Sequence, residues 1–465
     1  MSAKNTKRPP GPGFFKAMAV APSLMKDPIQ TLMGFVENYG DVALMNLGAM
    51  KVYLLTNPEY VKYVLQDNHA NYKKSSIYHE FSVLLGDNSL LTTNNMEKWR
   101  TQGRMIQPAF SRSHLENYSQ SVISLTRRML EEWDARLAAH PEAANQSVDV
   151  YAEMVRLLLS ITGTLLFGVD IGRDAPQIAD SMLTAFSFAM SRTTAPVKLP
   201  RDFPTPARLR TARAVRALDE IVMKLIAQRR QDENKYDDLL AVLIRATDED
   251  TGVRLTDQEL LDQIKTMLVA GHESPANCLI WALHLLSQNP EAAQKLYAEI
   301  DTVLGDREPT FADLPKLTYC ARVLDESMRL YPPAWLVERE PIKDDEIGGY
   351  QIKAGSRVTM FMYGVHRMPG VWEDPEKFDP DRFSEERSAK RHRFAFFPFS
   401  GGPRLCRGKD LSYVEMVVVL AMIAQRFRLR TDLTRPIEAL ASVNLRPKHG
   451  LHMFISPKVG VASAT

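Results

Sequence analysis

The sequence predicts a mainly α-helical fold with small β-sheets, organised as a single domain over residues 1–465. Strand-like patterns are short and confined to the N-terminal region and to the stretch that follows residue 334. No repeat, low-complexity tract or linker divides the chain. The strongest observation is a helical period of apolar residues in four long stretches: 115–140, 149–167, 207–231 and 255–287.

The first expected elements are an extended lead-in and a β-hairpin. Proline and glycine alternate over residues 9–13, so residues 1–25 are predicted to be an extended N-terminal segment. Strands are expected over 42–47 and 52–55, on either side of a short turn. Asn57 then precedes a proline, which is the pattern of a helix N-cap followed by N1.

The later elements have ordinary start and stop signals. The longest helix, 255–287, opens with Thr256-Asp-Gln-Glu259, a capping-box sequence. A loop is expected over 193–206, which contains four prolines. The other expected elements are helices over 97–106, 317–330 and 411–427 and a strand over 356–362.

The composition is that of a soluble protein from a reducing compartment. Apolar residues make up 45% and charged residues 25%, and the net charge of +2 provides no field for binding nucleic acid. Three scattered cysteines exclude a disulfide framework. No apolar run approaches the roughly 20 residues of a membrane span, and no signal peptide is recognisable. A cytoplasmic protein without a membrane span is therefore expected.

The clearest chemical signal is the segment from Phe399 to Gly408, which reads F-S-G-G-P-R-L-C-R-G. Its glycines permit close approach of the backbone to a flat ligand. Cys406 lies just before the helix expected over 411–427, where the helix dipole and free amides favour a thiolate. A lone thiolate lacks the four ligands of a zinc site but suits a metal already held by a macrocycle. The alternative is an inert cysteine beside a glycine-rich turn.

The pattern F-x-x-G-x-R-x-C-x-G resembles the haem-binding loop of the cytochrome P-450 family. Its fixed positions are Phe399, Gly402, Arg404, Cys406 and Gly408. The resemblance covers roughly residues 30–455. It implies the cytochrome P-450 fold, with a long central helix over the haem, and haem b whose iron is held by the Cys406 thiolate.

Two further motifs occur in family order. Glu326 and Arg329 are three residues apart on a predicted helix, so their side chains can pair. Pro380-Asp-Arg382-Phe383 resembles the later family segment whose arginine joins that pair. The resemblance implies that Glu326, Arg329 and Arg382 form a structural triad behind the haem and have no catalytic role.

The sequence Ala270-Gly-His-Glu-Ser274 resembles the oxygen-binding motif of the family. Ala270 and Gly271 leave room for a ligand beside the helix. Pro275 lacks an N–H and clashes with the carbonyl of Gly271, which predicts a broken helix at a pocket wall. Glu273 and Ser274 are candidates for delivering protons during oxygen activation. Serine stands where the family usually has threonine, so its hydroxyl is less restrained.

The resemblance also implies contacts to the haem carboxylates from Arg404, Arg339 and Trp99, through guanidinium forks and an indole N–H. The family often shows W-x-x-x-R in this early helix. Here Gly103 stands four residues after Trp99. The neighbouring Arg104 is a candidate substitute, although it lies about 100° further around the helix.

An apolar substrate is implied, because the family's substrate segments match apolar stretches over 77–85, 182–206 and 334–337. A fatty acid, a terpenoid, a steroid and a polyketide all remain open. The same side chains could equally be core packing. The candidate substrate residues are Phe81, Val83, Leu84, Ala270, Trp335, Leu336 and Val337.

The resemblance therefore implies a haem-thiolate monooxygenase that uses O2 to hydroxylate or epoxidise an apolar small molecule. Electrons from NAD(P)H are expected through a separate ferredoxin or flavodoxin-type donor with its reductase. The alternatives are peroxide-driven oxidation, rearrangement, or a non-enzymatic haem or ligand sensor. A basic group that could dock an acidic donor comprises Lys390, Arg391, Arg393, Arg404, Arg407 and Lys409.

Overall fold

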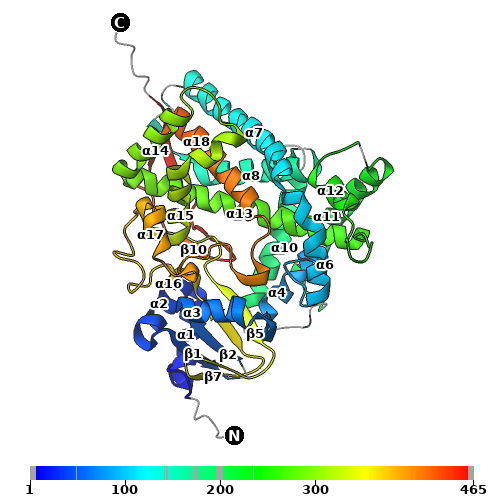
Figure 1. Cartoon of the computed structure of the whole chain (residues 1–465), viewed down its shortest axis with the longest axis vertical. Helices are drawn as coiled ribbons and strands as arrows, with labels where there is room; N and C mark the ends of the chain where they lie inside the picture. Colours follow the sequence, from blue (N-terminus) through cyan, green and yellow to red (C-terminus); the bar gives the residue numbers. More distant parts are fainter. Residues whose placement is uncertain are drawn as a thin grey trace.

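The computed structural model describes residues 7–458, except residues 49, 141, 143–144, 169, 172–175, 195–199, 201–202 and 234. Helices form the upper part of the molecule in Figure 1, and a smaller sheet-rich part lies below them. The long helix α13 (Asp257–Gln288) crosses the middle of the helical part (Figure 1).

The N-terminal region departs from the extended lead-in expected over residues 1–25, which is wrong from residue 14 onward. Helix α1 spans Phe14–Lys26 and packs on β1 (Val42–Leu47), with Ala17 buried. The proline-glycine segment before it crosses β1 closely, since a Cβ on Gly11 would lie 2.0 Å from the carbonyl oxygen of Leu44. Tertiary packing thus produces a helix that the local composition did not predict.

The main sheet has five strands in the order β1-β2-β8-β5-β3. β1 and β2 (Met50–Leu55) form the predicted hairpin, and β8 (Arg357–Met360) pairs parallel to β2. β5 (Val337–Pro341) pairs with β3 (Tyr72–Lys74) in a register that sets Lys74 opposite Arg339. This register brings two cations from distant segments side by side.

The predicted long helices are present, with ends shifted by a few residues. They are α6 (Met96–Ile106), α7 (Arg112–Ala139), α8 (Val150–Phe167), α11 (Pro206–Gln231), α13, α15 (Thr318–Leu330) and α18 (Lys409–Arg426). Helices that the sequence reading missed are α2 (Pro28–Tyr39), α10 (Pro176–Thr194), α12 (Leu239–Arg245) and α14 (Pro290–Val303). Half of the loop expected over 193–206 lies outside the described residues.

Short elements connect these helices. The helical ones are α3 (Pro58–Lys62), η1 (Tyr63–Asp67), η2 (His69–Asn71), α4 (Ser76–Glu80), α5 (Ser82–Leu85), η3 (Gln107–Phe110), η5 (Phe311–Lys316), α16 (Met362–Val365), η6 (Pro380–Phe383), α17 (Glu385–Ala389), η7 (Arg393–Ala395) and η8 (Gly402–Arg404). The remaining strands are β4 (Val148–Asp149), β6 (Asp345–Ile347), β7 (Tyr350–Ile352), β9 (Phe427–Thr431), β10 (Ala439–Ala441), β11 (Leu445–Pro447) and β12 (His452–Pro457).

Helix α13 begins with the predicted capping box, in which Thr256 and Glu259 bond each other's backbone N–H groups. It continues as one helix through Pro275, so the expected break is wrong. Residues 260–265 and 275–283 are all buried, and this packing holds the helix together despite the missing hydrogen bond. Between them, residues 266–274 are accessible, except Leu268. The middle of a core helix therefore offers a surface for a ligand.

Among the described residues, α8 is the one helix that is long and apolar enough to cross a membrane. Since 67% of it is buried inside the fold, the same features fit a core helix. α8 packs along α13, which makes it part of the wall behind the accessible stretch.

Candidate haem site

The Cys406 loop depends on Gly402, which has φ +66°. A Cβ there would lie 1.8 Å from the carbonyl oxygen of Leu65, so only glycine fits. The backbone N–H of Cys406 donates to the carbonyl of Phe399 at 3.1 Å and closes the loop. Gly408 precedes α18, and a Cβ on it would meet no atom within 4 Å. A flat ligand could therefore lie directly against its backbone.

Cys406 differs from the other two cysteines. Its side chain is accessible, whereas Cys278 and Cys320 are buried in the core. The protein packed around the Cys406 sulfur still desolvates it and raises the pKa of the thiol, and a backbone hydrogen bond from Gly408 acts in the opposite direction. Burial thus opposes the thiolate that the sequence predicts at the start of α18.

Three cations meet without a carboxylate partner among the described residues: Lys74, Arg339 and Arg404. Lys74 and Arg339 are 6% and 5% exposed. The Lys74 ammonium donates to the carbonyls of Leu90 and Leu91, and Arg339 donates to the carbonyl of Glu338 at 2.8 Å. Burial, with the neighbouring arginines second, holds the pKa of Lys74 well below its usual value. Such a cluster favours a bound anion, and two carboxylates of one ligand would offset two of the three charges.

Trp99 is 6% exposed and lies beside Arg404, with 5.1 Å between the guanidinium carbon and the ring centroid. Burial lowers the pKa of Arg404 to about 10, and the charge of Arg339 adds to the shift. Arg104 does not join this group. Its guanidinium pairs with Asp248 at 2.8 Å and with Asp250 at 3.0 Å, because its helix position turns it away from Trp99.

The predicted triad is fully buried. Arg329 donates to both oxygens of Glu326 at 2.6 and 2.8 Å, and Arg382 lies 3.4 Å from the same carboxylate. Arg329 also donates to three backbone carbonyls: those of His366, Pro375 and Lys377. These bonds tie α15 to the irregular segment before η6, so the triad has a structural geometry.

The motif residues on α13 differ in their exposure and in the groups that they contact. Ala270 is exposed. Gly271 allows α8 to approach, since a Cβ there would lie 3.1 Å from the Cγ2 atom of Thr162, and the residue is still partly accessible. The Ser274 hydroxyl donates to the side-chain oxygen of Asn444 at 3.3 Å, a restraint that sequence reasoning missed.

Glu273 is half-buried one residue before this serine. Glu273 acts on the half-buried Tyr151 of α8, because burial raises the pKa of that phenol and the charge of Glu273 adds to the shift. Arg446, which hydrogen-bonds Tyr151, opposes the shift. A carboxylate and a hydroxyl therefore occupy consecutive positions on the accessible part of α13.

The candidate substrate residues do not form one wall. Phe81 and Leu84 are buried in the main helical core, where Phe81 packs on Phe186 at 5.8 Å between ring centroids. Trp335 is buried against Phe361 and donates to the carbonyl of Ser442 at 2.7 Å. Val337 is buried in β5, whereas Val83 and Leu336 are half-buried.

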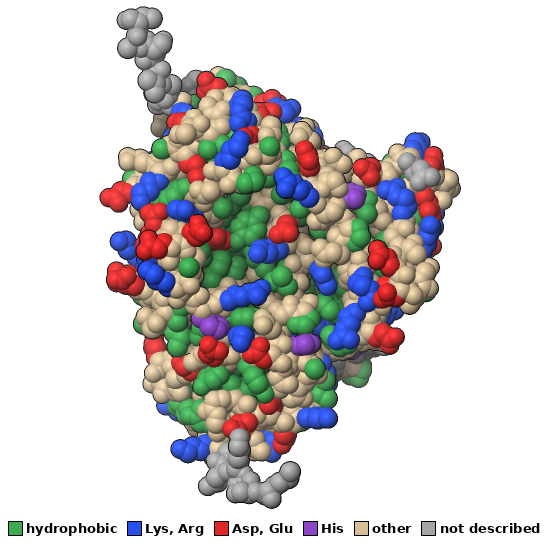
Figure 2. Space-filling view, in the orientation of Figure 1, with side chains coloured by type: hydrophobic (Ala, Val, Ile, Leu, Met, Phe, Trp, Pro, Cys, Tyr) green, Lys and Arg blue, Asp and Glu red, His purple; other side chains and the backbone are tan. Residues whose placement is uncertain are grey.

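The basic residues around the Cys406 loop fall into two sets, one packed on aromatic rings and one exposed to solvent. Arg391 stacks on Trp372 at 4.2 Å, and Arg404 turns inward to Trp99. Lys390, Arg393 and Lys409 remain exposed. Figure 2 shows Lys and Arg side chains beside a hollow lined by hydrophobic side chains in the middle of this face.

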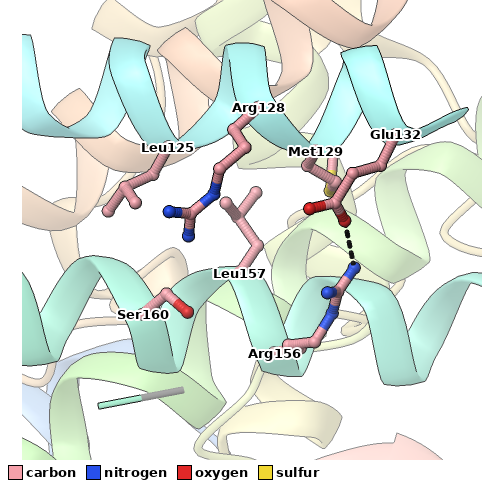
Figure 3. Close-up of a pocket in the computed structure, with 7 residues that line it drawn as sticks. All are labelled: Leu125, Arg128, Met129, Glu132, Arg156, Leu157 and Ser160. Atoms are coloured by element: carbon pink, nitrogen blue, oxygen red, sulfur yellow. Dashed lines mark hydrogen bonds and ion pairs between the residues drawn. The ribbon is translucent and has the colours of Figure 1, made fainter. Parts of the chain in front are cut away.

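These residues fit haem b. The accessible Cys406 sulfur, the open backbone at Gly408 and the uncompensated cations match an iron macrocycle with two carboxylates. The hollow in Figure 3 is a different feature. It lies between α7 and α8, where Arg156 donates to Glu132 at 3.1 Å, and none of the haem-site residues lines it (Figure 3).

Comparison with known proteins identifies the class. The family model for cytochrome P-450 matches residues 9–454, so the chain belongs to the cytochrome P-450 family. It is 35% identical to cyclooctat-9-en-7-ol 5-monooxygenase from Streptomyces melanosporofaciens over 90% of this chain and 89% of that protein. It is 31% identical to pentalenene oxygenase from Streptomyces avermitilis, over 93% and 94% of the two chains. Cyclooctatin synthase from Streptomyces melanosporofaciens is 32% identical, over 96% and 93%.

The protein is accordingly a cytochrome P-450 monooxygenase that acts on an apolar small molecule with haem b and O2. NAD(P)H provides the electrons through redox partners. The predicted fold class is confirmed.

Proposed function

We propose that the protein hydroxylates or epoxidises a polycyclic terpenoid in the cytoplasm, with electrons from a ferredoxin or flavodoxin-type donor. The similarity to monooxygenases that act on terpenoids supports this substrate class over fatty acids, steroids and polyketides. The accessible middle of α13 carries the proposal. Its exposed Ala270 and half-buried Met267 and Val269 present a small, apolar surface to a rigid hydrocarbon.

Different residues of the chain would bind the haem iron, bind the haem carboxylates and deliver protons. Haem b supplies the redox-active iron at which O2 is activated. Cys406 would hold that iron, and Lys74, Arg339, Arg404 and Trp99 would hold the haem carboxylates. Lys74 is an addition that the sequence did not suggest, because only the β3–β5 register places it beside Arg339.

On α13, Ser274 and Glu273 would hold and move protons. The hydrogen bond to Asn444 fixes the serine hydroxyl, which lacks the methyl group that would restrain a threonine. We propose that Asn444 thereby compensates for the serine in this motif. The carboxylate of Glu273 then returns protons from solvent to the hydroxyl.

For the substrate surface, we propose Val83, Leu336 and Ala270, whose side chains are at least partly accessible. Phe81, Leu84, Trp335 and Val337 are buried in the core and are not proposed as substrate contacts. For the electron donor, we propose docking on the exposed Lys390, Arg393 and Lys409, which favours an acidic partner.

A binding panel tests the substrate class. The purified haem protein is titrated with polycyclic terpenes, fatty acids and steroids, and the spin-state change of the iron is recorded. We expect a saturable change with polycyclic terpenes, reduced by Ala270→Phe and retained in Leu433→Phe, a change at an exposed residue after β9. A change with fatty acids alone would overturn the proposed substrate.

Turnover with a ferredoxin and its reductase tests the reaction. The product is expected to carry one added oxygen atom, labelled when 18O2 is supplied. Activity that requires peroxide and takes no label from O2 would favour the peroxide-driven alternative. Haem binding without any NAD(P)H-dependent product would favour the sensor.

A further inference from the structure

Arg407, the residue directly after Cys406, lies against α6 at Gly103. A Cβ built on Gly103 would be 3.1 Å from Nη2 of Arg407 and 3.7 Å from its guanidinium carbon. The same guanidinium carbon is 5.4 Å from the centroid of the Trp99 ring. The guanidinium of the loop thus occupies the place into which a side chain at position 103 would extend.

The partners of Arg407 leave its charge uncompensated. Its Nη1 donates to the side-chain oxygen of Gln107 at 2.7 Å, which is a neutral acceptor. Its Nε is buried and has no hydrogen-bond partner in the described part of the chain. No ion pair of Arg407 with an acidic residue occurs among the described residues either. A half-buried guanidinium with an unsatisfied N–H is costly unless an anion completes the site.

The surroundings indicate which anion fits. The guanidinium carbons of Arg407 and Arg404 both lie close to Trp99, at 5.4 and 5.1 Å from the centroid of its ring. Arg404 belongs to the cation group that the haem carboxylates would neutralise. A planar guanidinium beside an indole N–H is suited to two-point binding of a carboxylate.

We propose that Arg407 is a haem-carboxylate contact that replaces the arginine missing at position 103. This inference rests on the proposed haem-thiolate function. The cation has moved from α6 to the Cys406 loop, and Gly103 is the space that accommodates it. Two consecutive residues of one loop then hold the iron and a carboxylate of the same haem.

The contact geometry predicts a reciprocal relation between the two positions. Gly103→Arg alone would crowd Arg407, because even its Cβ would be 3.1 Å from Nη2. Arg407→Ala removes both the crowding and the cation. In the double variant, the new arginine has the space and restores the charge, so the two changes should compensate each other.

The experiment measures haem transfer from each ferric holoprotein to excess apomyoglobin, with the thermal midpoint as a check of folding. Arg407→Ala is expected to lose haem about tenfold faster than wild type, since one charge-assisted bond is removed. Arg100→Ala, at an exposed arginine of α6, is the matched control and should lose haem at the wild-type rate. The double variant Gly103→Arg/Arg407→Ala should recover most of the loss.

Two results would overturn the inference. The first is a wild-type rate of haem loss in Arg407→Ala. If that variant instead weakens binding of the electron donor, Arg407 contacts an acidic protein. The second is the absence of recovery in a folded double variant. A wild-type protein that binds no haem, or binds it without the thiolate spectrum, would contradict the proposed function itself and is recognised before any variant is compared.

Discussion

Replacing Glu326 by glutamine tests the triad behind the haem. The wild-type carboxylate compensates Arg329 at 2.6 Å and Arg382 at 3.4 Å, and all three side chains are at most 4% exposed. Glutamine has nearly the same shape and keeps one oxygen acceptor, so the change removes mainly the charge. Two guanidinium groups then remain buried with no compensating carboxylate at this position.

The expected cost follows from that burial. Breaking a buried ion pair by neutralising one partner costs about 3–5 kcal/mol, and the retained acceptor of glutamine favours the lower end. Unfolding entropy of about 2.1 cal/mol/K per residue gives about 1 kcal/mol/K for 465 residues. Glu326→Gln should therefore lower the thermal midpoint by about 3 °C.

The assay is a thermal scan of purified wild type and variant at one scan rate and equal haem content. Asp381→Asn is the matched control, because Asp381 pairs with Lys295 at 2.6 Å with both side chains partly exposed. Its midpoint should move by about 1 °C or less. Equal midpoints for Glu326→Gln and wild type would refute the reasoning that the triad stabilises the fold through compensated charge.

Three other changes have defined outcomes. Burial raises the pKa of Asp325 from 3.8 to about 6, so between pH 4 and 6 the folded protein holds a proton that the unfolded chain has released. The free energy of unfolding therefore falls as the pH rises through this range. Asp325→Asn should remove that part of the fall in urea titrations, and an unchanged pH profile would contradict the assignment. Ser274→Ala should lower the fraction of NAD(P)H that ends in product by about 10-fold to 100-fold without loss of haem, and wild-type coupling would exclude the relay. Gly402→Ala places a Cβ 1.8 Å from the Leu65 carbonyl oxygen and should prevent haem incorporation. Gly370→Ala is the control, because its Cβ would meet no atom within 4 Å, and it should incorporate haem normally. Normal haem content in Gly402→Ala would disprove the required close approach.

Much of the fold was predictable because its signals are local. The capping box at Thr256, the proline stops and the helical periods place the long helices within a few residues of their observed ends. Helix α1 could not be predicted in this way, since its packing on β1 decides its conformation. Pro275 misled for the same reason, because buried neighbours on both sides keep α13 continuous.

In the candidate site, too, the residues with local sequence signals were predictable and those placed by tertiary packing were not. The spacing around Cys406 and the Glu326–Arg329 pair are short-range features that a motif can specify. Lys74 depends on strand register, and Asn444 reaches Ser274 from 170 residues away, so neither carries a signal in its own segment. The place of Arg104 depends on Asp248, which no local pattern connects to α6.

The axial ligand is the central claim, and one spectrum tests it most directly. Reduced protein with carbon monoxide is measured for wild type, for Cys406→Ser and for Cys320→Ser, which removes a buried thiol as the control. The account predicts the red-shifted thiolate band in wild type and in Cys320→Ser, and its loss in Cys406→Ser. A thiolate band that persists in Cys406→Ser, or an imidazole-type band in wild type, would contradict it.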